Sequence, residues 1–283
     1  MVMVNFLHTF EPQPILFSLG AVNIYWYGLF IVLGIVAAGL VVIRLAKKYD
    51  LPEAQVFDLL FYLVLFGLIG ARLYDVLLEL PYYRAQPLAV LKVWQGGLAV
   101  HGAIIACALT VFVFAKRHRL DRWLLASLIA TAAPLAQAIG RWGNYFNQEL
   151  FGRPTGLPWG IPIDYVHRPA QYSSAQYFHP TFLYESVGNI LIFGFLLWLH
   201  LKITKTTDEP LRSRRYALSV MSYAILYSIL RFSLEFIKID RTPAVAGLRW
   251  PQIMSIIIIF VSLIGLAITY RRRTNAASSS SIE

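Results

Sequence analysis

Three residues could do chemistry that is unusual in apolar surroundings: His101, Arg141 and Arg231. An ionisable side chain inside a membrane-spanning segment is costly and indicates a functional site by default. The planar guanidinium of arginine binds phosphate through two parallel hydrogen bonds, and a neutral histidine accepts a proton near pH 7. Together the three residue types predict a site that holds a phosphate group and moves a proton.

The neighbours of Arg141 add further polar groups. In "IGRWGNYFNQELFGRP" the small residues Gly140 and Gly143 allow close backbone approach. Asn144 and Glu149 follow where the segment meets the outside. The alternative is that Arg141 only extends its charged end to the membrane surface.

The segment "YSILRFSLEF" places Tyr227, Arg231 and Glu235 four residues apart, and therefore on one face of a helix. Here a structural ion pair is the alternative to a phosphate site, because Arg231 and Glu235 have the spacing of such a pair. Arg72 and Asp75 have the related i,i+3 spacing. For Arg72 we interpret the pair as structural.

Composition excludes a water-soluble protein. The 283 residues are 58% hydrophobic and 14% charged, whereas soluble domains carry about 25% charged residues. The formal charge of +10 fits Lys and Arg in cytoplasmic loops, so no nucleic-acid partner is expected. The single cysteine, Cys107, excludes an internal disulfide framework and is interpreted as a small packing residue. No His, Cys or carboxylate spacing fits a metal site, and we expect no metal or other cofactor.

The long apolar runs predict an all-α integral membrane protein, a bundle of seven transmembrane helices. Each run is long enough to cross a bilayer, which takes about 20 residues. The predicted spans are Ile15–Ile43, Val56–Glu79, Gly96–Ala115, Trp123–Gly143, Thr181–Leu201, Tyr216–Phe236 and Pro251–Tyr270.

Lys and Arg are divided unequally between the two sides of this bundle. Loops on the side of residues 44–55 carry fifteen of them and loops on the other side seven. The positive-inside rule therefore places the N-terminus outside and the C-terminus in the cytoplasm. His101 then lies five residues inside its span, about 8 Å deep. Arg141, Arg231 and Tyr27 also fall on the outer side, so we expect one layer of polar groups near the outer headgroups.

The longest connection, residues 144–180, lies outside in this orientation. It is rich in glycine, proline and aromatic residues, which predicts a small ordered extracytoplasmic head. We interpret residues 1–270 as a single membrane domain with the head inserted. The polar, low-complexity tail 271–283 is predicted to be a disordered cytoplasmic segment.

Five motifs, in order along nearly the whole chain, resemble those of the bacterial prolipoprotein diacylglyceryl transferases. They are "YWYGLF", "WQGGLAVHGA", "GRWGNYFNQELFG", "HPTFLYES" and "YSILRFSLEF". The third is similar to the family signature, with Tyr145 in place of the usual Phe. Two further positions depart from the family pattern: Ser127, where many members carry Asp, and Phe182, where Gln is common.

The resemblance implies that the diacylglyceryl group moves from phosphatidylglycerol to the lipobox cysteine thiol of a prolipoprotein, with release of glycerol phosphate. This reaction is the first step of bacterial lipoprotein maturation. The implied partners are phosphatidylglycerol, the prolipoprotein signal peptide with its lipobox cysteine, and membrane lipids. The implied location is the bacterial cytoplasmic (inner) membrane, which the chain would cross several times.

The same resemblance implies roles for individual residues. A thiol needs a base before it becomes a good nucleophile; His101 is the first candidate base and Tyr227 the second. Arg141 and Arg231 would clamp the phosphate and stabilise the charge that grows on it. The remaining residues expected to bind phosphatidylglycerol are Tyr27, Asn144, Glu149 and Gly152.

A transporter of phospholipids or small solutes is the alternative function. It would predict inverted repeats, broken helices at the midplane and polar residues over the whole bilayer depth. The chain has no internal repeat of that kind, and its polar residues lie mostly in the outer half. A non-catalytic scaffold would not need a layer of one histidine and two arginines. The sequence therefore favours a one-sided enzyme.

Overall fold

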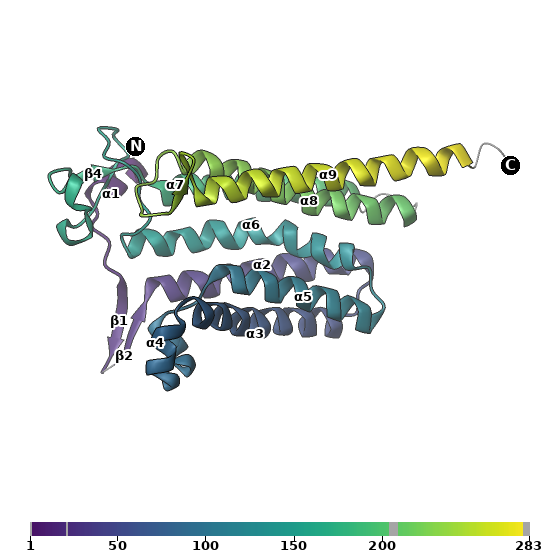
Figure 1. The fold of residues 1–283 in the computed structure, drawn as a ribbon, viewed down its shortest axis with the longest axis horizontal. Helices are drawn as coiled ribbons and strands as arrows, with labels where there is room; N and C mark the ends of the chain where they lie inside the picture. Colours follow the sequence, from purple (N-terminus) through teal and green to yellow (C-terminus); the bar gives the residue numbers. More distant parts are fainter. Residues whose placement is uncertain (1, 21, 204–208, 280–283) are drawn as a thin grey trace. The chain divides into compact units, whose positions relative to one another are not determined.

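The protein is described by a computed structural model that covers residues 2–20, 22–203 and 209–279, most of them helical (Figure 1). The α-helices of this part are α1 (Val2–Thr9), α2 (Trp26–Ala46), α3 (Glu53–Leu78), α4 (Leu80–Ala85), α5 (Val100–His118), α6 (Arg122–Phe146), α7 (Thr181–Ile203), α8 (Glu209–Leu234) and α9 (Trp250–Ser279). Its strands pair antiparallel, two by two: β1 (Ile15–Leu19) with β2 (Val22–Tyr25), β3 (Ile161–Pro162) with β4 (Tyr177–Phe178), and β5 (Ala244–Val245) with β6 (Leu248–Arg249).

Seven of the described helices are long and apolar enough to cross a membrane, namely α2, α3, α5, α6, α7, α8 and α9. The chain is therefore a multi-pass, all-α membrane protein, and the predicted fold class is confirmed. Each of these helices overlaps one of the seven predicted spans. The spans differ from the prediction chiefly where two of them begin.

The predicted start of the first span was wrong. Residues Ile15–Leu19 and Val22–Tyr25 pair as the β1–β2 hairpin, and α2 begins only at Trp26. The chain reverses at Gly20, whose φ of +59° is a backbone conformation that glycine adopts without steric cost. An apolar run by itself does not distinguish a strand from a helix, so hydropathy merged the hairpin with the helix that follows it.

The third span also begins later than predicted. Gly96 and Gly97 have φ values of +92° and +74°, which a right-handed helix does not accept. The helix α5 therefore starts at Val100, and His101 is its second residue. The predicted depth of about 8 Å assumed a helix from Gly96 onward; His101 instead lies in the first turn of α5.

Arg72 of α3 holds the glycine turn in place. Its side chain is 8% exposed and lies 3.9 Å from Asp75, as the i,i+3 spacing predicted. The guanidinium donates hydrogen bonds to four backbone carbonyls of the connection between α3 and α5, those of Ala89, Val90, Gly96 and Gly97. The structural interpretation of Arg72 is thus confirmed, since its donors go to the chain itself.

The chain divides into two compact units. Unit 1 comprises Met1–Ala38, Ala130–Lys205 and Leu218–Glu283, and unit 2 comprises Gly39–Ile129 and Thr206–Ala217. The interpretation of residues 1–270 as one membrane domain stays a prediction. The predicted disordered tail, residues 271–283, overlaps the end of α9, which is helical to Ser279. The last four residues of the tail, 280–283, lie outside the described part.

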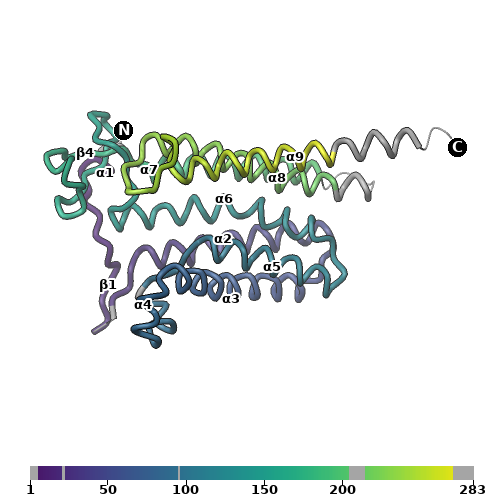
Figure 2. The backbone as a smooth tube through the Cα atoms, in the orientation of Figure 1, coloured from purple at the N-terminus to yellow at the C-terminus, as the bar shows by residue number. Residues whose placement is uncertain are grey.

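Glycines let the helices of unit 1 approach closely. A Cβ at Gly34 of α2 would lie 2.9 Å from the carbonyl oxygen of Ala136 in α6, and one at Gly188 of α7 would lie 2.6 Å from Leu230 of α8. The helices α8 and α9 run alongside each other (Figure 2), with Gly265 against the Met221 side chain. Small residues at helix contacts are what membrane bundles use, because lipid gives helices little hydrophobic reason to associate.

In unit 2, α3 and α5 form an antiparallel pair with equally close packing. Gly70 and Gly102 face each other so closely that neither position has room for a Cβ. Cys107 packs against Gly67 and donates a 3.6 Å hydrogen bond to the Leu63 carbonyl. This contact agrees with the interpretation of Cys107 as a small packing residue.

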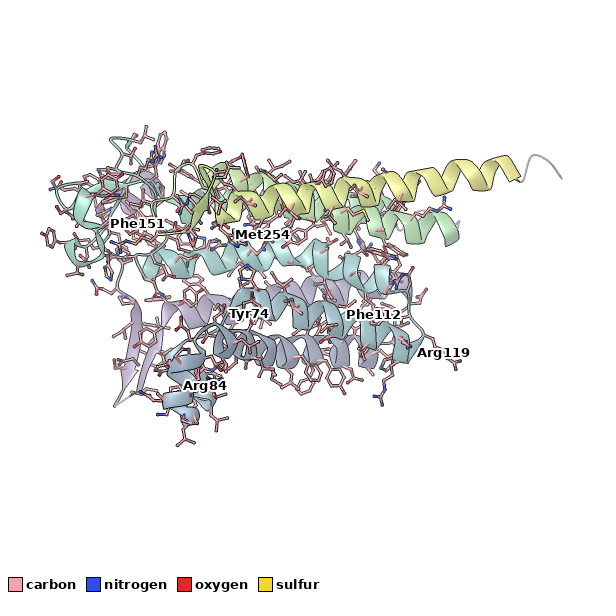
Figure 3. The ribbon with its side chains drawn as sticks, viewed as in Figure 1. Tyr74, Arg84, Phe112, Arg119, Phe151 and Met254 are labelled. Atoms are coloured by element: carbon pink, nitrogen blue, oxygen red, sulfur yellow. The ribbon has the colours of Figure 1, made fainter. Side chains whose placement is uncertain are left out.

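The head of unit 1 has its own buried core. Its buried members are Leu7, Tyr145, Phe151, Ile161, Ile163, Phe178 and Phe182, and Figure 3 labels Phe151 among the side chains of this region. The N-terminal helix α1 belongs to it, since His8 stacks on Tyr177 at 3.9 Å and hydrogen-bonds the Gly160 carbonyl. The connection 144–180 is therefore ordered, as its composition predicted.

Candidate active site

A buried carboxylate, Glu185 of α7, lies at the centre of the cationic residues of unit 1. Its side chain is 1% exposed, and its Oε1 lies 2.6 Å from Arg141 Nη2. The same oxygen accepts a 3.3 Å hydrogen bond from the Tyr227 hydroxyl. The other oxygen, Oε2, lies 3.3 Å from Lys238 Nζ and 3.8 Å from Arg231 Nη1. Three cations and one phenol thus converge on a single carboxylate.

A second buried carboxylate, Glu235, fixes the far side of Arg231. Its Oε1 lies 2.5 Å from Arg231 Nη2, so the ion pair that the i,i+4 spacing predicted is present. Its Oε2 lies 3.1 Å from Arg249 Nε. Arg249, at the end of β6, also pairs with Asp240 at 3.1 Å and donates a 2.6 Å hydrogen bond to the Lys238 carbonyl. Both sides of Arg231 are therefore held by buried acids.

Two titratable groups just beyond α8 have displaced pKa values. Burial lowers the pKa of Lys238 below its usual range, although the carboxylate of Glu185 acts in the opposite direction. For Asp240, burial raises the pKa, but the Thr242 hydrogen bond and the charge of Arg249 outweigh it, and the net pKa is lowered. Asp240 therefore stays ionised at neutral pH, and Lys238 releases its proton more readily than an exposed lysine does.

A chain of hydrogen bonds runs from Arg141 towards the head. Arg141 Nη1 donates to Asn144 Oδ1 at 3.2 Å, and Asn144 Nδ2 donates to Glu149 Oε1 at 2.7 Å. Glu149 in turn lines a cavity of about 590 Å³. The cavity is lined by Pro14, Asn147, Gln148, Glu149, Leu150, Phe151, His167, Pro169, Ile239 and Asp240. The guanidinium is thus linked by hydrogen bonds to a residue that lines this cavity.

Tyr27 and Gly152 lie at tight backbone contacts of the same unit. A Cβ at Gly143 would come within 2.7 Å of the Tyr27 ring, so glycine is what lets Tyr27 lie against α6 two residues from Arg141. At Gly152 a Cβ would lie 2.7 Å from Ile237 and 2.8 Å from His179. Gly152 therefore joins the head to the turn after α8, which also carries Lys238.

His101 belongs to unit 2, in the first turn of α5. It is exposed, and its ring lies 6.0 Å from that of Tyr74 in α3. The turn that precedes it is the one held by Arg72. Its position is therefore set by a rigid connection, and the ring itself is free of close polar contacts among the described residues of unit 2.

The two carboxylates at the site in unit 1 are more deeply buried than the two arginines that they hold. The side chains of Glu185 and Glu235 are 1% and 0% exposed, whereas those of Arg141 and Arg231 are 22% and 21% exposed. The acids are thus more deeply buried than the guanidinium groups, which stay partly exposed. Pre-oriented donors of this kind can stabilise an anion without reorganising when it forms. Chemically, the arrangement suits a phosphate more than a neutral ligand.

The structure brings together seven of the eight residues that the sequence nominated: Tyr27, Arg141, Asn144, Glu149, Gly152, Tyr227 and Arg231 all lie in unit 1. Sequence reasoning missed Glu185 and Lys238. Glu185 could have been found, because it is an ionisable residue inside the span Thr181–Leu201, and such a residue needs a partner. Lys238 was counted only as a loop cation.

The departures from the family pattern lie in ordinary packing environments. Phe182 stacks on Tyr145 at 4.7 Å in the core of the head. The Tyr145 hydroxyl donates a 3.4 Å hydrogen bond to the Phe10 carbonyl. Ser127 is fully buried and donates a 2.7 Å hydrogen bond to the Leu124 carbonyl of its own helix. Tyr145 and Phe182 thus belong to the packing of the head, and Ser127 to that of unit 2.

Comparison with known proteins identifies relatives along the whole chain. The sequence model of the family described as prolipoprotein diacylglyceryl transferase matches residues 14–268. A phosphatidylglycerol–prolipoprotein diacylglyceryl transferase of Trichormus variabilis is 38% identical over 268 residues, 95% of this chain and 93% of its own. Proteins of the same name from Parasynechococcus marenigrum and Synechococcus elongatus are 40% and 37% identical, covering 93% and 92% of this chain and 96% and 88% of their own.

Proposed function

The chain belongs to the prolipoprotein diacylglyceryl transferase family, and from that premise we propose that it transfers a diacylglyceryl group from phosphatidylglycerol to the cysteine thiol of a prolipoprotein. The thiol would be that of the lipobox, which follows the apolar span of the signal peptide. The reaction would take place at the outer side of the bacterial cytoplasmic membrane, as the first step of lipoprotein maturation. The observation that carries the proposal is the pair of partly exposed guanidinium groups held on buried carboxylates.

The proposed step is a displacement at carbon. The cysteine thiolate attacks the glycerol carbon that bears the phosphate, a sulfur–carbon bond forms, and the carbon–oxygen bond breaks. The electron pair of that bond goes to the phosphate, which changes from a diester with one negative charge into glycerol phosphate with two. The thiol proton passes to a base on the protein, so atoms and charge balance without a cofactor.

Arg141 and Arg231 would act on the charge that grows on the leaving phosphate. Because a second negative charge develops as the bond breaks, their attraction is greater in the transition state than in the bound lipid, which is what accelerates a reaction. Glu185, 2.6 Å from Arg141 and 3.8 Å from Arg231, would hold the two guanidinium groups in a common orientation. This role makes Glu185 a positioning residue.

His101 would take the thiol proton. A cysteine thiol has a reference pKa of about 8.5, so a base is needed to give a useful concentration of thiolate at neutral pH. Tyr227 is the second candidate, but its hydroxyl already donates to Glu185. Because the Tyr227 proton is already engaged in this hydrogen bond, His101 is favoured as the base and Tyr227 as a further positioning group.

The headgroup of phosphatidylglycerol would lie towards the head of unit 1. Its glycerol carries hydroxyl groups; a carboxylate accepts hydrogen bonds from hydroxyls, and an amide both accepts from them and donates to them. Asn144 and Glu149, linked to Arg141 by hydrogen bonds of 3.2 and 2.7 Å in series, offer such groups. The cavity of about 590 Å³ beside Glu149 would accommodate the glycerol.

The direct test is transfer by purified protein. The full-length chain in detergent micelles is incubated with phosphatidylglycerol labelled in its acyl chains and with a synthetic lipobox peptide, and the peptide is analysed by mass spectrometry. We expect the peptide mass to rise by one diacylglyceryl group and glycerol phosphate to appear in equal amount. A peptide with Ser in place of the lipobox Cys is the control and should stay unlabelled. Unmodified peptide, or lipid movement across vesicles without transfer, would refute the proposed function.

A further inference from the structure

A hollow of about 640 Å³ follows the helix pair α3 and α5 in unit 2. It is lined by two helix stripes, which together define what we name the α3–α5 groove. From α3 come Asp58, Tyr62, Phe66, Ile69, Gly70 and Leu73; from α5 come Ala106, Leu109, Thr110, Val113, Phe114, Arg117 and His118. In each stripe the residues recur at helical spacing, so each helix gives one continuous face to the groove.

The length of the groove matches one leaflet of a bilayer. Twelve residues separate Ala106 from His118, which is about 18 Å along a helix. Half of a hydrocarbon core of about 30 Å is about 15 Å. Most of the lining over this length is apolar, with Leu109 59% exposed and Leu73 56% exposed. The groove is therefore apolar over the depth that one lipid chain occupies.

Polar groups are concentrated at one end of the groove. Arg117 and His118 come from the last turn of α5 and Asp58 from the first turns of α3. Within the part of the chain that the structure describes, no ion pair joins Asp58 to Arg117. Lys116, Arg119 and Arg122 lie beside this end in sequence, and the distribution of Lys and Arg predicts that it is cytoplasmic. Anionic lipids are attracted to such clusters in that leaflet.

Aromatic side chains form the wall below the polar end. The rings of Tyr62 and Phe66 stack at 5.9 Å, and the ring of His118 stacks on Phe114 at 4.1 Å. Deeper in the membrane the lining changes to small residues, with Gly70 against Ala106. The groove thus has a rigid wall near the headgroup level and its closest helix packing towards the bilayer centre.

The dimensions favour a lipid chain over a peptide helix. A helix with its side chains is at least about 10 Å wide, and over 18 Å it would occupy about 1,400 Å³. The groove offers about 640 Å³, which is enough for an unbranched chain but less than half of the volume of such a helix. A signal-peptide helix would moreover bring its basic N-terminal region towards Arg117, and these like charges would repel each other.

We propose that the α3–α5 groove binds one acyl chain of an anionic phospholipid in the leaflet next to the basic loops, with the lipid phosphate against Arg117 and a headgroup hydroxyl against Asp58. Arg117 supplies the planar fork that binds phosphate. The carboxylate of Asp58 is exposed and can accept a hydrogen bond from a hydroxyl of the same headgroup. The groove shares no residue with the set assigned to transfer, and the proposal does not rest on the proposed function.

The test is photolabelling of the full-length protein in detergent micelles with phosphatidylglycerol that carries a diazirine in its acyl chain. Labelled residues are located by peptide mass spectrometry. We expect label on the groove-lining stripe of α5, at Leu109 and Val113, and much less at Ile105 and Phe112, which are also membrane-facing but do not line the groove. Excess unlabelled phosphatidylglycerol should compete better than phosphatidylcholine, which has no net charge and no headgroup hydroxyl.

Two substitutions with matched controls test the two halves of the site. Arg117→Gln should weaken labelling in the groove about fivefold, the effect of one basic residue at an anionic membrane surface. Arg119→Gln removes the same charge from a residue that follows α5 and extends away from the helix pair (Figure 3), and should leave labelling unchanged. Leu109→Trp should fill the groove and displace the chain, whereas Ile105→Trp should not.

Three outcomes would overturn the proposal. Equal labelling of all membrane-facing residues of α5 would mean ordinary contact with bulk lipid. Equal effects of Arg117→Gln and Arg119→Gln would mean diffuse attraction without a site. Displacement of the label by a signal peptide would mean that a helix docks there. Transfer activity, measured on the same preparations, is a separate readout: its absence in the unsubstituted protein would refute the proposed function and leave the labelling pattern as it is.

Discussion

Replacement of Glu185 by Gln removes one negative charge from the centre of the cationic cluster and changes little else. The amide has nearly the same shape as the carboxylate, and its oxygen can still accept a hydrogen bond. Arg141, Lys238 and Arg231, which lie 2.6, 3.3 and 3.8 Å from the carboxylate, lose their common counter-ion. We expect lower stability and slower transfer, because both depend on how these cations are held.

The size of the stability loss follows from burial. Removing one partner of a buried ion pair costs about 3–5 kcal/mol, since the other charge stays buried and uncompensated. Lys238, 1% exposed, carries most of this cost, while Arg141 is 22% exposed and keeps part of its hydration. Lys238 can avoid being a buried, uncompensated charge by losing its proton. For a lysine with an ordinary pKa, this deprotonation costs about 5 kcal/mol at pH 7. Its pKa is lowered by burial, so the loss should stay nearer 3 kcal/mol.

The assay is reversible unfolding of the purified chain in mixed micelles, with the fraction of SDS as denaturant. Glu53→Gln is the matched control: it breaks an ion pair with Lys47 of nearly the same length, 2.7 Å, whose side chains are about 60% exposed. Exposed pairs contribute little, so this variant should unfold like the parent. The double variant Glu185→Gln/Lys238→Met should regain part of the loss, because contacting residues couple by about 0.5–3 kcal/mol.

The reasoning would be refuted by equal stability of Glu185→Gln and Glu53→Gln. That result would mean that water reaches Glu185 and that the cluster is solvated. An unchanged transfer rate in a destabilised Glu185→Gln variant would separate the two roles: the carboxylate would then hold the fold without orienting the guanidinium groups.

Four further predictions concern single positions. Arg141→Lys should lose about 10²–10³ in transfer rate, nearly as much as Arg141→Ala, because a point charge does not reproduce a two-pronged contact; near-normal turnover would mean that Arg141 only reaches for the membrane surface. His101→Gln should bind phosphatidylglycerol normally and lose about 10²–10⁴ in rate, with partial recovery as pH approaches the thiol pKa; weakened lipid binding with no recovery would exclude His101 as the base. Arg72→Gln should cost about 3 kcal/mol, since it leaves several carbonyls of the 89–97 connection without their donor, and should expose that connection to proteolysis. Burial lowers the pKa of His179 in the folded chain. Between that lowered pKa and about 6.5, the unfolded chain therefore binds a proton at this histidine that the folded chain does not bind. The free energy of unfolding should fall on acidification through this pH range, and His179→Gln should flatten that part of a curve of stability against pH.

The sequence by itself determined the class of the protein, and it predicts the side of the membrane on which to look. Seven apolar runs are readable because the thickness of the bilayer fixes the length of a span and because burial in lipid depends on each residue's own polarity. The distribution of Lys and Arg is likewise a property of the sequence alone. The shared helix face of Tyr227, Arg231 and Glu235 was predictable too, because the period of a helix is fixed by its backbone. The family motifs named seven of the residues that the structure brings together in unit 1.

Only the tertiary structure decided which partners these residues have. Glu185 and Lys238 are 53 residues apart, and Arg141 reaches Glu185 from a third segment, so no local period relates them. Such contacts depend on which helix faces pack together, and here glycines such as Gly188 set how closely α7 and α8 approach. Tertiary structure also decided that the apolar run from Ile15 begins as a hairpin. It decided as well that Arg72 donates hydrogen bonds to the turn at Gly96 and Gly97. Polarity along a chain is additive and can be read residue by residue, whereas the pairing of charges depends on distances that exist only once the helices have packed.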